Sequence, residues 1–377
     1  MARIAIDARH IASTTGRYIE RLVSWLPKVD QDHEYLLLLK PQDRERYRLE
    51  AANMSAIDAP QALYGIDEQT ELLRLLNRLE ADLVHFCMPS QPILYRGRVV
   101  TTFHDLTQLV QRGGGPGQRL KRRVAHSVYL RAARRSELLI APSETVRAQL
   151  IKFAGLPAER VRVTYEAAEP SKDGNEPIPA LADTQFILYV GSHAAHKNVP
   201  SLIYSHQQLR ASHPELQLVL AGTLASDAPG TAAPTRAWTD AQGFDGIIYT
   251  GYVSDRQLAW LYGNAAAFVF PSYSEGFGLP GLEAMAAGAP VVSSNATCLP
   301  EIYGNAATYF SPDDIAGLVD SVAGLLNAPE LRAEMIARGH AQAARYSWER
   351  LARQTLAIYD EALATAPPVR RPAPADR

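Results

Sequence analysis

The chain has 377 residues, which is enough for two domains of ordinary size. A hydrophobic content of 47% and a charged content of 21% are typical of a folded globular protein and exclude a disordered one. The formal net charge of −2 argues against nucleic acid as a main partner.

The two cysteines and the N-terminal residues indicate a cellular compartment. Cys87 and Cys298 lie far apart and without metal-ligand spacing, so we expect two buried thiols in a reducing environment. The first residues lack an apolar signal core, and no segment is long and apolar enough to span a membrane. We therefore expect a cytoplasmic protein.

Short apolar runs alternate with longer amphipathic stretches, the pattern of β-α units around a parallel sheet. In the first half, helices are predicted to begin near Gly16, Asp67, Gly117 and Ser143. Residues 169–184 are rich in Pro, Gly and charge and predict a linker. The strands of this half are predicted at residues 3–8, 34–40, 82–86, 98–105, 137–143 and 161–165.

After the linker the pattern restarts, and the closing stretch 329–364 reads as two or three consecutive helices. The sequence therefore predicts an α/β protein with two doubly wound domains and a cleft between them. Ligands of such sheets bind beyond the carboxyl ends of the strands. Strands are predicted at residues 186–191, 216–222, 246–251, 266–271, 290–294 and 308–310, and helices near 199–212, 255–263, 280–287 and 312–327.

Residues 274–292, SEGFGLPGLEAMAAGAPVV, form a glycine-rich turn that leads into the helix predicted at 280–287. Free backbone N–H groups and the helix dipole make such a turn suitable for binding an anion. A glutamate in a first helical turn often only compensates the dipole, which would account for Glu283. That explanation covers neither Glu275 nor the three glycines between the two glutamates.

Three further loops carry candidate residues. His196 and Lys197 follow the strand at 186–191 and precede a helix, where a cation suits a diphosphate; a solvated lysine is the alternative. His104 ends the strand at 98–105 and is either a catalytic or hydrogen-bonding residue or a structural one. Gly16 starts a helix and would let a phosphate or sugar approach the backbone.

The segment 106–136 has no acidic residue, whereas Leu120, Val124, Val128 and Ala132 recur every four residues. These residues predict a basic amphipathic helix at 117–135. Such a helix can contact an anionic membrane surface or a lipid-linked diphosphate, and the alternative is that its basic face is only solvated. Both interpretations stay open. The basic residues are Arg112, Arg119, Lys121, Arg122, Arg123, Arg131, Arg134 and Arg135.

Taken together, these stretches resemble a family 4 glycosyltransferase of the GT-B fold, similar to bacterial mannosyltransferases that build O-antigen and related polysaccharides. The resemblance covers about residues 1–363, and the two-glutamate segment with its GFGLP core is the specific part. The matching stretches are IAIDARHIASTTGRY, VVTTFHDLTQL, LLIAPSETVRAQL, ILYVGSHAAHKN, YTGYVSDRQLAWLY, FVFPSYSEGFGLPGLEAMAAGAPVVSSNATCLPEI and RYSWERLARQTL.

The resemblance implies a retaining transfer of a sugar from a nucleotide donor to a hydroxyl, without a metal or other cofactor. Lys197 would neutralise the donor diphosphate, Glu275 would hold the donor sugar near its 3-hydroxyl, and Glu283 would hold the ribose. His104 would contact the region of the sugar's 6-hydroxyl, which gives His104, Lys197 and Glu275 as the catalytic set. The other donor contacts would come from Gly16, Ser192, His196, Tyr252, Val253, Gly276, Phe277, Gly278 and Leu279.

The resemblance also implies a domain plan and partners. Residues 1–170, with a C-terminal helix at about 347–364 packing back on them, would form the acceptor-side domain, and 171–346 the nucleotide-sugar domain. A disordered tail is expected at 365–377. The donor would be GDP-mannose and the acceptor a glycan or a lipid-linked glycan of cell-surface polysaccharide such as lipopolysaccharide. The protein would then work in the cytoplasm, associated with the inner face of the cell membrane.

The chain departs from the family at two loops. TTGRY has one glycine where relatives commonly have two, and His196 stands where relatives carry a second fixed positive charge. Because a histidine is neutral or partly charged near pH 7, we expect the donor diphosphate to bind less tightly at high pH.

Several other functions are compatible with doubly wound domains. A UDP- or dTDP-sugar-dependent transferase, a nucleotide-sugar epimerase or a sugar-phosphate synthase would use the same fold. A catalytically silent glycan-assembly partner would not need His104, Lys197, Glu275 and Glu283 together. A nicotinamide dehydrogenase is disfavoured because no predicted strand is followed by a G-x-G-x-x-G turn.

Overall fold

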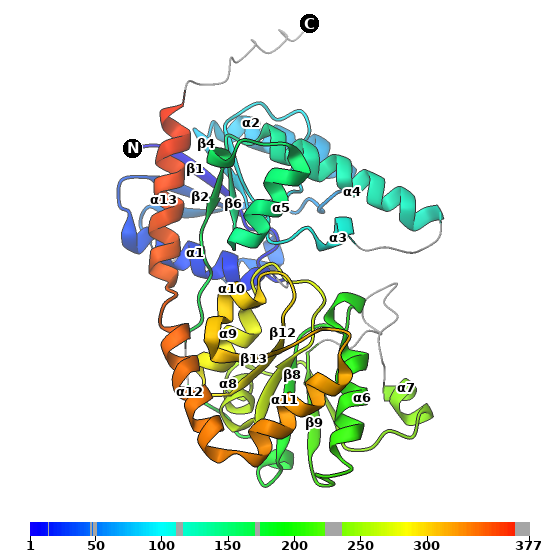
Figure 1. The fold of residues 1–377 in the computed structure, drawn as a ribbon. Coiled ribbons are helices and arrows are strands. Elements are labelled where there is room, and N and C mark those ends of the chain that lie inside the picture. The colour runs from blue at the N-terminus through cyan, green and yellow to red at the C-terminus, as the bar shows by residue number, and fades with distance from the viewer. Residues whose placement is uncertain are drawn as a thin grey trace, which may run out of the picture. The chain divides into compact units, whose positions relative to one another are not determined.

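The computed structural model of the protein describes residues 1–13, 15–45, 47, 51–110, 116–169, 174–222 and 236–365. The chain divides into two compact units, each described by itself below. Unit 1 comprises Met1–Glu166 and Trp348–Arg377, and unit 2 comprises Ala167–Ser347 (Figure 1). Residues 170–173, near the start of the predicted linker, and the tail from residue 366, predicted to be disordered, lie outside the described residues.

Unit 1 is built on a seven-stranded parallel sheet of order β3-β2-β1-β4-β5-β6-β7. The inner strands read as nearly continuous apolar runs because helices cover both faces. Only the edge strand β3 was not predicted, and most of its residues are at least partly exposed. The strands are β1 (Arg3–Asp7), β2 (Glu34–Leu39), β3 (Met54–Asp58), β4 (Leu83–Phe86), β5 (Val99–Thr102), β6 (Leu138–Ala141) and β7 (Val161–Val163).

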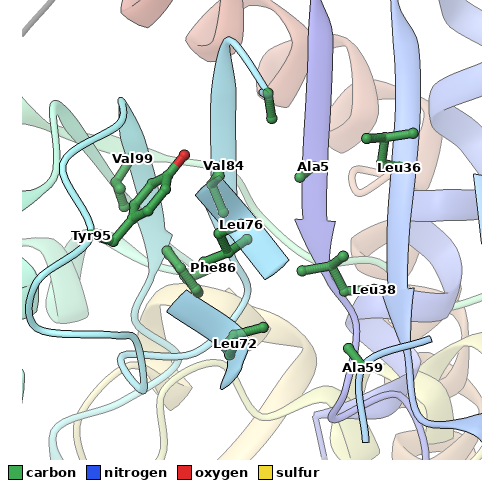
Figure 2. Close-up of a cluster of buried hydrophobic side chains, with 11 residues drawn as sticks. Ala5, Leu36, Leu38, Ala59, Leu72, Leu76, Val84, Phe86, Tyr95 and Val99 are labelled. Carbon is green, nitrogen blue, oxygen red and sulfur yellow. The ribbon is translucent and has the colours of Figure 1, made fainter. Parts of the chain in front are cut away.

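The helices of unit 1 begin close to the predicted positions. Ser143 caps α5 by accepting a hydrogen bond from the amide of Val146. Figure 2 shows Leu72 and Leu76 packed with Val84 and Phe86 in one of the buried clusters. The elements are α1 (Gly16–Val29), a π-helical turn (Glu68–Leu72), α2 (Leu73–Leu79), α3 (Thr107–Val110), α4 (Pro116–Arg135), α5 (Glu144–Ala154), α13 (Trp348–Ala364) and 3-10 turns at Pro41–Asp43 and Ala158–Arg160.

Helix α13 is the last element of the described chain, yet it packs against α1 in unit 1 (Figure 1). Tyr359 of α13 contacts Nδ1 of His85 on β4 at 2.6 Å, and Thr102 contacts Nε2 of the same ring at 2.8 Å. Tyr18 of α1 contacts Thr102 at 3.0 Å. A buried chain of hydrogen bonds therefore ties the C-terminal helix to the sheet and to α1.

Unit 2 is built on a six-stranded parallel sheet of order β10-β9-β8-β11-β12-β13. Its strands are β8 (Phe186–Val190), β9 (Gln217–Ala221), β10 (Ile247–Gly251), β11 (Ala267–Phe270), β12 (Val291–Ser294) and β13 (Ala307–Phe310). Its helices are α6 (Val199–Leu209), α7 (Arg236–Ala241), α8 (Asp255–Asn264), α9 (Leu279–Ala286), α10 (Leu299–Tyr303), α11 (Ile315–Asn327) and α12 (Pro329–Ala343), with 3-10 turns at Pro179–Leu181, Ala195–Lys197 and Gly304–Ala306.

The predicted fold class is confirmed: both units are doubly wound, Rossmann-like domains. The strand order reverses between β1 and β4 in unit 1 and between β8 and β11 in unit 2. Such switch points are where α/β proteins bind ligands. Gly16 follows β1, Lys197 follows β8 and Glu275 follows β11, so these candidate residues lie on loops at the switch points.

The buried His85 makes the stability of the protein sensitive to acid. Burial lowers its pKa to about 3, and burial likewise lowers the pKa of His10 to about 4. In an unfolded chain a histidine has a pKa of about 6.5. Below that pH the unfolded state binds protons that the folded state does not bind. The free energy of unfolding is therefore highest above about pH 6.5 and falls as the pH drops toward the folded-state pKa values of His85 and His10.

We predict that a His85→Gln variant loses less stability than the wild type between pH 6.5 and pH 4.5. The difference should reach up to about 1.4 kcal/mol per pH unit, the weight of one proton. Urea unfolding at a series of pH values measures it, with His126→Gln at an exposed position as the matched control. An unchanged pH slope in His85→Gln would contradict the assignment.

Candidate active site

The loop from β11 to α9 in unit 2 is held in one conformation by its glycines. Gly278 has a φ of 91°, in the left-handed region that favours glycine. The Tyr303 hydroxyl donates to the Gly278 carbonyl at 2.5 Å, and a Cβ atom on Gly278 or Gly281 would lie only 2.5 or 2.3 Å from that hydroxyl oxygen. Glycine is therefore required where the backbone packs against Tyr303. The loop delivers the chain into α9, where Pro280 has no N–H and the Gly281 and Leu282 amides donate to the Gly278 carbonyl, so the turn ahead of the helix is the part predicted to meet an anion.

Lys197 and Glu275 meet at the carboxyl ends of the neighbouring strands β8 and β11. The Lys197 Nζ donates to both carboxylate oxygens of Glu275, at 2.8 and 2.9 Å. The two side chains are 17% and 11% exposed, so the ion pair is largely sheltered from solvent. The structure thus brings together the residue predicted for the diphosphate and the one predicted for the donor sugar.

The loops that carry this pair are tied to each other. The Tyr273 amide donates to the His196 carbonyl at 2.7 Å. Asn198 is left-handed, with a φ of 55°, and its side-chain amide donates to the carbonyls of Pro271 and Pro312. The Lys197 loop therefore cannot shift without disturbing the Glu275 loop.

A second set of bonds fixes the backbone of Glu275 itself. Its amide donates to the Thr297 hydroxyl at 3.0 Å, and that hydroxyl donates back to the Glu275 carbonyl at 3.1 Å. The Cys298 thiol lies 3.3 Å from the same carbonyl oxygen. Thr297 has a φ of 50°, a strained conformation for a β-branched residue, and such strain is often found at functional sites.

Glu283 lies on α9 and has a different environment from Glu275. Its Oε2 accepts a hydrogen bond from the hydroxyl of Tyr262 on α8 at 3.2 Å. One glutamate thus faces a cation and the other a neutral phenol. The two carboxylates of the segment are therefore suited to different partners.

The remaining predicted donor contacts lie on loops at the same edge of the unit 2 sheet. The Ser192 carbonyl, after β8, accepts from the Tyr189 hydroxyl at 2.6 Å. Tyr252, after β10, is 83% exposed, and Val253 beside it is partly buried. Gly276 and Phe277 are buried and Leu279 is partly exposed at the start of α9. Their contacts with a donor stay predictions.

In unit 1, His104 is held from three sides. Its Nε2 lies 3.1 Å from the Cys87 carbonyl oxygen, and its Nδ1 lies 3.4 Å from Oε1 of Glu166. The Tyr18 ring packs edge-on against the imidazole, with the centroids 4.8 Å apart. The ring orientation is therefore fixed before any ligand binds.

Gly16 has a structural reason to be glycine. A Cβ atom there would lie 1.9 Å from the carbonyl oxygen of Ile11, so any side chain would displace the loop that precedes α1. Its amide donates to the Ser13 carbonyl at 2.9 Å. This packing accounts for the glycine, and the predicted phosphate contact stays a prediction.

Two family models match the chain in succession. The model described as "Glycosyltransferase Family 4" matches residues 15–172, and the one described as "Glycosyl transferases group 1" matches residues 173–342. O-antigen chain mannosyltransferase B of Escherichia coli is 33% identical over 285 residues, which cover 70% of each chain. The chain belongs to glycosyltransferase family 4.

Other relatives of this glycosyltransferase are also mannosyltransferases by name. A serotype-specific mannosyltransferase, WbdA of Escherichia coli, is 30% identical over 226 residues, which cover 57% of this chain and 27% of the relative.

Among solved structures, sucrose-phosphate synthase from Thermosynechococcus elongatus matches with a TM-score of 0.77, 19% identity and coverage of 97% and 100% of the two chains. HepE of Anabaena in complex with UDP matches with a TM-score of 0.74, 15% identity and coverage of 96% and 100%. The fold is GT-B.

Two kinds of site can be assessed directly in the glycosyltransferase. Within the ranges that the structure describes, no group of three or more His, Cys, Asp or Glu side chains is arranged to hold a metal ion. Within the same ranges, no helix has both the length and the apolar content that crossing a membrane requires.

Sequence reasoning missed the residues that position the glycosyltransferase's candidate site. Thr297 and Cys298 lie 22 and 23 residues after Glu275, and only the fold shows their contacts. Tyr262 and Tyr18 lie inside stretches that carried the resemblance but had no assigned role. Glu166 follows the strand predicted at 161–165 and had no assigned role. None of these positions has a local pattern that reports a side-chain partner.

We predict that Thr297→Val slows sugar transfer at least about 10-fold, because the Glu275 amide loses its part-buried hydrogen-bond partner and the carboxylate loses its position. Thr297→Ser keeps the hydroxyl and should retain transfer. Affinity for the nucleoside diphosphate that binds best should stay within about 2-fold in both variants, since Lys197 is untouched. Steady-state kinetics with calorimetric binding separates the two effects, and normal turnover in Thr297→Val would refute the positioning role.

Proposed function

We propose that this glycosyltransferase moves mannose from GDP-mannose to a hydroxyl of a glycan or lipid-linked acceptor, with retention, in cell-surface polysaccharide synthesis. The observation that carries the proposal is the Lys197–Glu275 pair ahead of α9. Two relatives at 30–33% identity are mannosyltransferases by name, and one of them is named for the O-antigen chain, which supports the sugar and the acceptor class.

The pair performs the reaction by exchanging partners. A donor diphosphate binds Lys197 Nζ and the backbone amides of the turn at 276–279, ahead of α9, both of which favour negative charge. Glu275 is thereby released from Lys197 and accepts hydrogen bonds from hydroxyls of the donor sugar. Glu283, already facing the Tyr262 hydroxyl, takes the ribose hydroxyls. His104 of unit 1 hydrogen-bonds the sugar's 6-hydroxyl region.

The charges at this site match those that develop in the reaction. Breaking the bond between the anomeric carbon and the phosphate oxygen leaves positive charge on the sugar and negative charge on the diphosphate. Glu275 stabilises the former, and Lys197 with the turn amides stabilises the latter. The acceptor hydroxyl attacks on the face that the diphosphate leaves, and its proton goes to the departing phosphate oxygen. This route needs no protein base, and Lys197 supplies the positive charge that a metal would otherwise contribute.

The proposal also includes a location. The reaction would take place in the cytoplasm, at the inner face of the cell membrane, where a lipid-linked acceptor is accessible. The basic helix α4 is the element that would contact this acceptor or the surface around it.

The experiment that tests this function is a thermal-shift screen of GDP, UDP, ADP and dTDP sugars, followed by transfer assays. We predict the largest shift with GDP-mannose, because a ligand raises apparent stability with its occupancy. Glu275→Ala should lower transfer by at least about 100-fold in a folded protein. Glu334→Ala, at an exposed ion pair on α12, is the matched control and should be unaffected. A largest shift with another nucleotide sugar would overturn the donor, and near-normal turnover of Glu275→Ala would overturn the mechanism.

A further inference from the structure

Unit 1 contains a cavity of about 200 Å³ that has no part in the site described above. It lies between the π-helical turn, the loop after β4 and the C-terminal half of α4. Its apolar wall is formed by Pro92, Ile93, Val124, Val128 and Ala132. Apolar cavities of about 150 Å³ already accept a benzene-sized guest, so this one can hold a short aliphatic segment.

The carboxylate and amide groups at the cavity are largely committed to protein partners. The Glu68 carboxylate accepts from Arg9 at 2.9 Å and from the Ser90 hydroxyl at 2.8 Å. Gln69 accepts from the Ile93 amide at 2.8 Å and donates to the Gln91 carbonyl at 3.3 Å.

The two arginines that line the cavity are engaged as well. Arg131 donates to the Ile93 carbonyl at 2.8 Å, and Arg135 donates to the carbonyls of Tyr95 and Gly97 at 2.9 and 2.7 Å. Among the described lining groups, the buried Nε2 of Gln91 lacks a partner. The apolar wall offers no partner to the hydroxyls of a sugar, whereas an aliphatic chain needs none.

The backbone around the cavity is unusual in two places. Tyr64 has a φ of 58°, which is rare for a bulky residue, and its ring is half exposed at the rim. Glu68 begins a π-helical turn, a form that is frequent at functional sites. Both features are costly for the fold and lie at the same cavity, as expected where a binding surface constrains the chain.

The apolar wall continues outside the cavity along α4. Val124 is 56% exposed and Leu120, one turn earlier, is 63% exposed, while Val128 and Ala132 lie deeper. The N-terminal half of α4 extends past α5 (Figure 1). Arg122, Arg123 and His126 flank this half of the helix, and the segment 106–136 has no acidic residue. The surface outside the cavity therefore attracts an anion next to an apolar stripe.

We propose that the cavity and the α4 stripe bind one amphiphile, an aliphatic chain joined to a phosphate. The chain lies over Leu120 and Val124 with its end in the cavity, and the phosphate meets the cations of α4. This deepens the proposed function, on which it rests, because the amphiphile would be the carrier of a lipid-linked acceptor.

The test is calorimetric binding of farnesyl phosphate, kept below its micelle-forming concentration, to the whole protein. Farnesyl phosphate should bind at least about 10-fold more tightly than farnesol or inorganic phosphate, since both halves contribute. Val124→Asp should weaken binding at least about 10-fold, because it places a negative charge under the aliphatic chain and near the negative phosphate of the ligand. Val124→Leu should bind as the wild type does, and so should Leu331→Asp, which alters an exposed apolar residue on α12.

Three results would overturn the inference. The first is equal binding of farnesyl phosphate to Val124→Asp and the wild type. The second is inorganic phosphate binding as tightly as farnesyl phosphate, which would leave an anion site only. The third is a mannose oligosaccharide that binds more tightly than farnesyl phosphate and is lost in Val124→Asp, which would indicate a glycan site.

A GDP-mannose thermal shift on the same samples separates this inference from the proposed function. A protein that shifts with GDP-mannose but does not bind farnesyl phosphate contradicts the amphiphile site alone. A protein that binds farnesyl phosphate but does not shift with GDP-mannose contradicts the proposed donor alone.

Discussion

The ion pair between Lys197 and Glu275 is the interaction on which the candidate site depends. Both groups are largely sheltered, and a sheltered charge without a partner is costly. In the free enzyme each satisfies the other at 2.8–2.9 Å. Asn198, the Tyr273 amide and Thr297 hold the two loops in register, so that the pair is preformed. In the proposed mechanism, a donor exchanges the Lys197–Glu275 ion pair for a contact of Lys197 with the diphosphate and a contact of Glu275 with the sugar, at little cost in reorganisation.

This arrangement explains why carboxylates stand beside a helix start that favours anions. In the proposed mechanism, the amides of the turn ahead of α9 and the ammonium of Lys197 carry the positive charge of the site, and Glu275 balances it until a diphosphate binds. Glu283 lies on α9 itself and accepts a hydrogen bond from the Tyr262 hydroxyl. The two glutamates therefore have different environments, as the proposed contacts with a donor sugar and a ribose require.

Much of this architecture could be predicted because the positions of strands and helices follow from local sequence patterns. The period of the apolar residues located the strands of both sheets apart from β3, and the helix predicted at 280–287 is α9, which runs one residue earlier at each end. The residues that position the site could not be found in this way. Thr297 follows β12 and contacts Glu275, which follows the neighbouring strand β11, so only the folded sheet brings the two together. Glu166 follows β7 and contacts His104, which follows β5, two strands away in the unit 1 sheet. Gly16 was read as a ligand contact, whereas its close approach to Ile11 is a packing requirement that only coordinates reveal.

The most direct test of the partner exchange is the affinity of GDP, without its sugar, for Glu275→Gln and for the wild type. Isothermal titration at low ionic strength measures it. If Lys197 must leave Glu275 to bind a diphosphate, removing the carboxylate charge should tighten GDP binding by about 3- to 10-fold, while sugar transfer is lost. GDP binding that is unchanged or weaker in Glu275→Gln would contradict the account.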